Sequence, residues 1–172
     1  MGYIQRFNMD NAFLLDSLKR QFADQVVEIP DTHDLLTVKV DKEHIISVLE
    51  FLKKEKELQF IHLTDITAVH YPNQKDEFAI VYHVHSLIHN IRIRVKVFLE
   101  GPDPDIQTAT VVWKGANWME RETYDFFGIN FIGHPDLRRI LNVDDMTVFP
   151  MRKEYPLEDP NRVDKKDLYF GR

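Results

Sequence analysis

Residues 78–99, FAIVYHVHSLIHNIRIRVKVFL, decide the fold. Apolar and polar residues alternate on both sides of His89-Asn90, which is typical of a β-hairpin with one buried face. A two-residue turn at this pair would place residue 88 opposite 91, 84 opposite 95 and 82 opposite 97. All the apolar side chains would then share one face. The other face would carry four cationic or titratable side chains: His83, His85, Arg94 and Lys96.

The segments around this hairpin add both strands and helices. Helical spacing predicts a helix from Asp10 or Asn11 to about Ala23, with either residue as its cap, and a second helix that begins after an Asp41 cap. We expect further strands at 26–29, 35–40, 60–69 and 108–113, a loop at 100–107 and a last helix at 118–127. The order predicts an α+β fold, a mostly antiparallel sheet with helices packed on one face, followed by an extended C-terminal tail.

The last predicted helix has recognisable signals at both ends. Asn117 is expected to cap it, with Glu120 three residues on as the second half of a capping box. Gly128 is expected to end it in the left-handed conformation. Within the helix, Arg121 and Asp125 stand four residues apart and are expected to form an ion pair.

The domain boundary is expected near residue 132. We interpret residues 1–132 as a compact domain and 133–172 as an extended docking tail, because prolines interrupt every candidate element of the tail. Arg138 and Arg139 are adjacent, so they cannot share one face. At least one of them is expected to point toward protein or toward a partner.

Composition excludes several classes of function. The chain of 172 residues has no cysteine, which excludes disulfides, thiolate-held clusters and a thiol nucleophile. It has no glycine-rich nucleotide loop and no Gly-x-Ser-x-Gly setting for a serine nucleophile. Its net charge of −6 disfavours nucleic acid held by bulk positive charge. No run approaches the ~18 apolar residues of a membrane span.

The face with the histidines leaves alternatives open. His83, His85 and a third ligand such as His89 would suit a metal hydrolase, although Lys96 and Arg94 opposite the first two would repel a cation. The same face, with Arg92, could instead bind an anion or RNA, or meet an acidic protein surface.

Three stretches near the C-terminus carry a family resemblance. They are residues 120–129 (ERETYDFFGI) with Phe131, residues 133–141 (GHPDLRRIL) and residues 152–157 (RKEYPL). Together they resemble the signature of the 30-kDa subunit, designated C, of the proton-pumping NADH–quinone oxidoreductase, respiratory complex I.

The resemblance implies a subunit with no catalytic residue, metal or cofactor of its own. It would be a scaffold in the hydrophilic arm, beside the large quinone-site subunit and the iron–sulfur subunits, for electron transfer from NADH to quinone. Flavin, iron–sulfur clusters and quinone would belong to those partners. The chain would bind no nucleic acid and would reach the membrane only through the complex, on the cytoplasmic side. The corresponding subunit of a membrane-bound hydrogenase or of another quinone reductase is the alternative.

The resemblance and the charge density of the tail together predict a partner interface. Its expected residues are Glu120, Arg121, Glu122, Asp125, His134, Asp136, Arg138, Arg139, Arg152 and Lys153.

Overall fold

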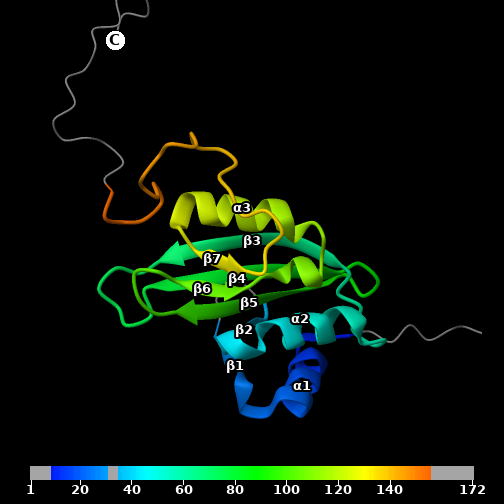
Figure 1. The fold of residues 1–172 in the computed structure, drawn as a ribbon. Coiled ribbons are helices and arrows are strands. Elements are labelled where there is room, and N and C mark those ends of the chain that lie inside the picture. The colour runs from blue at the N-terminus through cyan, green and yellow to red at the C-terminus, as the bar shows by residue number, and fades with distance from the viewer. Residues whose placement is uncertain (1–8, 31–34, 156–172) are drawn as a thin grey trace, which may run out of the picture.

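A five-stranded sheet forms the centre of the protein (Figure 1). The computed structural model describes residues 9–30 and 35–155. The strands of this sheet lie in the spatial order β1-β2-β5-β4-β3, which are Val26–Ile29, Thr37–Val40, Ile91–Leu99, Phe78–Ser86 and His62–His70. Only β2 and β5 are parallel among these described strands. The prediction of an α+β fold with a mostly antiparallel sheet is confirmed.

Three α-helices and several short elements complete the described part of the chain. The helices are α1 (Asn11–Phe22), α2 (Ile45–Lys54) and α3 (Ala116–Phe127). The 3₁₀ turns are η1 (Ala23–Gln25), η2 (Lys42–His44) and η3 (Ala109–Val111). A small parallel pair is formed by β6 (Asp105–Gln107) and β7 (Asn130–Ile132).

The two N-terminal helices start in different ways. Asp10 caps α1, because its carboxylate accepts the Phe13 N–H at 2.8 Å. It is one of the two residues predicted as the cap. The cap predicted at Asp41 is wrong. Residues 42–44 form a 3₁₀ turn, the Asp41 side chain makes no capping bond, and α2 begins at Ile45. Its helical spacing is confirmed, because four apolar residues at these intervals are buried: Ile45, Val48, Leu49 and Leu52.

The core lies between one face of the sheet and the helices. Alternate residues of β4 and β5, such as Tyr82 and Val95, are fully buried in one cluster with residues of all three helices. Burying each such aliphatic or aromatic side chain contributes on the order of 1.5–3 kcal/mol. Ala79 and Val81 are also buried but lie outside this cluster, because their side chains point to the opposite face. The helices therefore cover one face only, as predicted.

The register of the β4–β5 hairpin differs from the prediction by two residues. Ser86 pairs with Ile91 and Tyr82 with Val95, so residues 87–90 form the turn and Ile88 is 60% exposed. Asn90 turns the chain with a φ of 53°. A shift by two residues leaves every side chain on its predicted face, and for that reason the alternation of apolar residues could not fix the register.

Two predictions between residues 100 and 113 are wrong. Residues 105–107 form strand β6 rather than a loop, and residues 108–113 contain η3 rather than a strand. Local hydrogen bonds explain the turn. The Thr108 hydroxyl accepts the Thr110 N–H at 3.1 Å, and the Glu120 carboxylate accepts the Ala109 N–H at 2.6 Å.

The start of α3 also differs from its prediction, and its end agrees. The helix begins at Ala116 after Gly115, so Asn117 lies inside it and the predicted capping box is wrong. Glu120 turns inward instead, since its carboxylate is used by residues 108 and 109. Gly128 ends the helix with φ 72° and donates its N–H to the Tyr124 carbonyl at 2.8 Å, which confirms the left-handed stop.

Residues 133–155, here called the docked segment, contain neither helix nor strand and run alongside α3 (Figure 1). They belong to the predicted docking tail, whose remaining residues, 156–172, lie outside the described residues. Among the described helices, none is both long and apolar enough to span a bilayer.

Candidate functional site at the last helix and the docked segment

Helix α3 buries an unusual number of polar side chains. Glu120, Arg121, Thr123 and Asp125 are all buried, although charged residues rarely are unless they are paired. Thr123 is satisfied locally, because its hydroxyl lies 2.8 Å from the Met119 carbonyl. The three charged residues are bound by segments that precede and follow the helix.

Glu120 joins α3 to the turn before it. Its carboxylate accepts the Thr108 hydroxyl at 2.5 Å and the Ala109 N–H at 2.6 Å. Burial raises the pKa of Glu120 to about 7, and these two hydrogen bonds oppose that rise. A buried carboxylate that changes its charge near neutral pH is therefore part of this site.

Two further titratable side chains lie around Glu120. The His134 imidazole Nε2 is 3.9 Å from the carboxylate and 3.2 Å from the Asn117 carbonyl, and the His134 side chain is fully buried. The Tyr82 hydroxyl is buried with no hydrogen-bond partner among the described residues. Burial, helped by the charge of Glu120, raises the pKa of Tyr82 well above its ordinary value. The cluster connects β4, α3 and the docked segment.

Asp125 joins α3 to the docked segment. Its carboxylate accepts N–H bonds from Ile140, Leu141 and Asn142 at 2.8–3.1 Å and a guanidinium bond from Arg139 at 2.7 Å. Burial alone would raise the pKa of Asp125, but these bonds hold that pKa far below its usual range. The predicted ion pair between Arg121 and Asp125 is wrong, because Arg139 takes that carboxylate.

Two arginines bind the docked segment to α3 through hydrogen bonds. Arg139 donates to the carbonyls of Met146 and Val148 at 2.7 and 3.0 Å, and its side chain is only 9% exposed. Arg121 reaches in the other direction, from α3 to the carbonyls of Arg138 and Arg139 at 3.1 and 2.8 Å. Such planar, multidentate contacts suit guanidinium groups. The segment is therefore held by side chains in place of a strand or helix.

The end of the segment packs over Gly128. A Cβ at this glycine would lie 2.5 Å from the Phe149 ring and 2.7 Å from the Arg152 guanidinium. Arg152 also donates to the Phe127 carbonyl at 2.7 Å and lies 5.0 Å from the centre of the Phe78 ring. Only glycine combines this close approach with the left-handed backbone.

A backbone contact anchors the segment further along. The Met151 N–H bonds the Phe126 carbonyl at 3.1 Å, and the Lys153 N–H bonds the His70 Nδ1 at 2.9 Å. Because that nitrogen accepts the Lys153 N–H, it does not donate a hydrogen bond to the Glu154 carboxylate, which lies 3.4 Å away.

The ten predicted interface residues divide into three groups by exposure. Five point inward, with their side chains largely or fully covered: Glu120, Arg121, Asp125, His134 and Arg139. Arg152 is half-buried. Four are exposed: Glu122, Asp136, Arg138 and Lys153. Of the adjacent arginines, Arg139 is the one that points toward protein, while Arg138 is 69% exposed beside Asp136.

Sequence reasoning missed the apolar outer side of this region. Several large hydrophobic side chains of α3 and the docked segment are exposed, between 39% and 64%: Trp118, Leu141, Val143, Met151 and Tyr155. It also missed the buried role of Thr108, for which no motif signals a carboxylate partner twelve residues later.

The histidines of β4 are arranged differently from the metal interpretation. The Arg94 guanidinium donates to the His83 Nε2 at 3.0 Å and so takes the lone pair that a metal would need. Among the described residues, no group of three or more potential ligands gathers.

Taken together, the fold and this site define an α+β domain whose last helix and following segment are joined by buried charged side chains. Residues 38–161 match the family model described as respiratory-chain NADH dehydrogenase, 30 Kd subunit. The NADH-quinone oxidoreductase subunit designated C in Citrifermentans bemidjiense is 45% identical over 155 residues, which cover 90% of this chain and 92% of that protein. Its counterpart of the same name in Geobacter sulfurreducens is 41% identical, with 90% and 93% covered.

Solved structures agree with the sequence relatives. A trypsin-resistant fragment (1–134) of Nqo5 is 32% identical to this chain, with a TM-score of 0.62. The matched region covers 72% of this chain and 98% of the fragment. A chain of an archaeal membrane-bound sulfane sulfur reductase shares the fold, at 22% identity with a TM-score of 0.73 over 90% and 95% of the two chains. The chain belongs to the family of the 30-kDa subunit of respiratory-chain NADH dehydrogenase. It is thus a hydrophilic-arm subunit of NADH–quinone oxidoreductase.

Proposed function

We propose that this chain is a scaffold without redox chemistry of its own, which joins the quinone-site large subunit to the iron–sulfur subunits through α3 and the docked segment. The observation that carries the proposal is that buried and exposed side chains of this region differ in kind. The buried charges hold the segment in place, and its outer side presents apolar side chains.

The internal bonds explain why an irregular segment can serve as an interface. A segment without helix or strand would normally lose much conformational entropy on binding. Here Asp125 accepts three consecutive backbone N–H groups, and Arg139 binds two carbonyls of the same segment. The segment is ordered before it meets a partner, so association costs less.

The apolar side chains supply the affinity in this proposal. Exposed hydrophobic side chains that gather in one region mark interaction surfaces. Leu141 and Val143 are 64% and 63% exposed, and Met151 is 51% exposed. Aromatic, Met and Arg side chains are enriched at such interfaces, and Trp118 and Arg138 fit this preference.

The exposed charges are proposed to set orientation. Glu122, Asp136, Arg138 and Lys153 lie at the surface of the same region and would form a polar rim. Rim charges mainly steer the encounter and exclude wrong partners. Flavin, clusters and quinone are proposed to reside on the partner subunits, and the chain is proposed to lie on the cytoplasmic side of the membrane.

Two variants of similar exposure test the proposal. Leu141→Asp places a charge on the outer side of the segment, and Leu87→Asp places one on the hairpin turn, where Leu87 is 55% exposed. In a complex purified through a tag on this chain, Leu141→Asp should reduce the recovery of the other subunits at least tenfold. Leu87→Asp should leave it unchanged. Equal recovery with both variants would contradict the proposed interface.

A further inference from the structure

The sheet face opposite the helices carries a band of positive charge. Its side chains alternate with the core residues along β2 and β5: Lys39, Arg92, Arg94 and Lys96. Among the described strands of the sheet, one carboxylate lies in register with this band, that of Asp65 on β3. These residues are called the basic sheet face below. The whole chain, by contrast, has a net charge of −6.

Two of these lysines are direct neighbours across the sheet. Lys39 of β2 pairs in register with Lys96 of β5, and both side chains are half-buried. Like charges opposite each other on adjacent strands are destabilising. Lys39 relieves part of this by leaning over the Phe98 ring, with its Nζ 5.2 Å from the ring centre. A carboxylate between the two ammonium groups would relieve the rest.

The face also holds apolar side chains and an unsatisfied polar atom. Ala79 and Val81 lie on it, and Val27, in register with Lys39, is 53% exposed. The Nε2 of His85 is buried with no hydrogen-bond partner in the described structure. Of these groups, only the Val27 side chain is exposed, and its apolar area beside the charges fits a surface that a protein covers.

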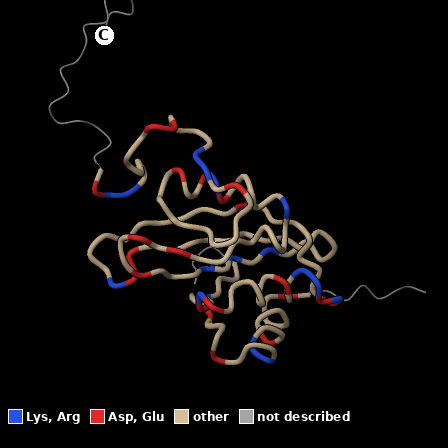
Figure 2. Tube along the Cα trace, viewed as in Figure 1, with Lys and Arg blue, Asp and Glu red and all other residues tan. Residues whose placement is uncertain are grey.

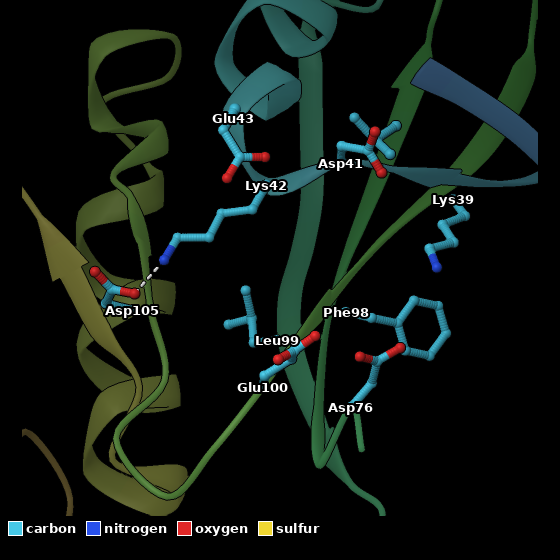
Figure 3. A pocket seen from close by; sticks show the side chains of 10 residues that line it. Lys39, Asp41, Lys42, Glu43, Asp76, Phe98, Leu99, Glu100 and Asp105 are labelled. Atoms are coloured by element: carbon cyan, nitrogen blue, oxygen red, sulfur yellow. Dashed lines mark hydrogen bonds and ion pairs between the residues drawn. The ribbon is translucent and has the colours of Figure 1, made fainter. Parts of the chain in front are cut away.

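One end of this face is acidic. A hollow of about 390 Å³ at this end is lined by lysines and by acidic residues. Figure 3 shows Lys39 and Phe98 on one side of the hollow and Lys42, bound to Asp105, on the other. Asp76 and Glu100 also line it. Figure 2 shows that the loops at this end of the sheet carry mostly acidic residues. The charge along the face is therefore polarised.

We propose that the basic sheet face binds an acidic segment of another protein subunit, with carboxylates over Lys39 and Lys96. The acids that line the hollow keep the carboxylates of that segment away from this end of the face, where Glu100 is already paired with Lys75 at 2.8 Å. This inference rests on the proposed function only in that the chain must sit in a complex. It concerns a surface on the far side of the sheet from α3 and the docked segment.

The chain's own C-terminal residues are a poor occupant. Residues 156–172 contain four acids and four bases, so their charges cancel. Nucleic acid is disfavoured by the acidic end of the face and by the overall charge. A partner protein with its own acidic segment matches the polarity of the face.

Zero-length cross-linking tests the inference directly. A carbodiimide joins lysine amines to carboxylates that already touch them. In the complex purified through a tag on this chain, Lys39 and Lys96 should link to Asp or Glu of another subunit. The control Lys39→Arg with Lys96→Arg keeps both charges, so it should keep the subunit and lose the links. Links to this chain's own carboxylates, or none in the intact complex, would overturn the inference.

Charge reversal gives the second measurement. In the double variant Lys39→Glu with Lys96→Glu, the subunit identified by cross-linking should dissociate at a salt concentration at least threefold lower than in the wild-type complex. Lys56→Glu with Lys114→Glu makes the same charge change at exposed sites elsewhere and should behave like the wild type. A thermal melt of each isolated chain separates misfolding from lost binding.

The outcomes distinguish this inference from the proposed function. If tagged protein brings down no other subunit at all, the proposed function fails. If the subunits stay bound regardless of these lysines, only the present inference fails. Release of bound nucleic acid, rather than protein, would also overturn it.

Discussion

The Arg139 guanidinium lies 2.7 Å from the Asp125 carboxylate, and this contact joins the docked segment to α3. The Asp125 side chain is fully buried, while Arg138, the residue before Arg139, points outward with 69% of its side chain exposed. Two adjacent arginines of the same motif therefore have different tasks. Arg139 holds the segment to its own domain, and Arg138 faces what lies beyond it.

The first prediction separates these tasks. Arg139→Ala strands a buried carboxylate and should lower the free energy of unfolding by about 3–5 kcal/mol. Arg138→Ala should change it by less than about 0.5 kcal/mol. Urea unfolding of both variants measures the difference, and trypsin should cut within 133–155 faster in the first. Similar stability of the two variants would show that the Asp125 contact does not hold the segment.

The second prediction concerns the pH dependence of stability. The folded-state pKa of Glu120 is raised to about 7, so folding favours its protonated form. The stability from this group is fully present below its ordinary pKa, 4.5, and is lost as pH rises through 7. Glu120→Gln keeps an acceptor without a charge. Its unfolding free energy relative to the wild type should therefore rise by up to about 3 kcal/mol between pH 5 and pH 8.

Chemical unfolding of both proteins at pH 5 and pH 8 checks this. The pKa of Asp125 is shifted in the opposite direction, and its contribution is lost only as pH falls below the ordinary carboxyl range, so it does not interfere in this window. A stability difference that stays constant with pH would mean that Glu120 is ionised throughout.

The third prediction compares two glycines at the ends of α3. Gly128→Val places a β-branched residue at φ 72° and a Cβ 2.5 Å from the Phe149 ring. The backbone cost alone is on the order of 1–2 kcal/mol, and displacement of the docked segment adds to it. Gly115→Ala meets open space and should have little effect. A Gly128→Val melting temperature indistinguishable from that of the control would contradict the packing described.

The fourth prediction concerns the isolated chain. It should be colourless, oxidise no NADH and hold no metal tightly, because it has no thiolate or nucleotide loop and Arg94 occupies the His83 Nε2. Metal analysis of purified protein checks this. Stoichiometric zinc or iron that disappears in His83→Ala would instead support the hydrolase alternative.

Much of the fold follows from the sequence because its signals are local. The alternation along residues 78–99 specified which face is buried, and Gly128 marked the end of α3. Register was misjudged because a shift by two preserves the faces. The start of α3 and the 108–113 segment were misjudged for one shared reason. Glu120 looked like a local cap but bonds to Thr108 and Ala109, and contacts between distant segments leave no local pattern.

The sequence indicated the region of the candidate site, but not the contacts that its individual side chains make. The charge density of 133–141 drew attention to a stretch that is bonded to α3, but it did not indicate which charges point inward. Burial of Arg139 and exposure of Arg138 depend on where Asp125 places its carboxylate. The apolar outer side was missed because Leu141, Val143 and Met151 do not follow a helix or strand period.

The central claim is that this chain works as a scaffold between subunits, and purification under native conditions through a tag on it tests that claim most directly. We expect the iron–sulfur and quinone-site subunits to be recovered with it, with iron–sulfur absorbance and NADH–quinone reductase activity in the same fraction. Recovery of the folded chain alone from membranes that retain full quinone reductase activity would contradict the claim.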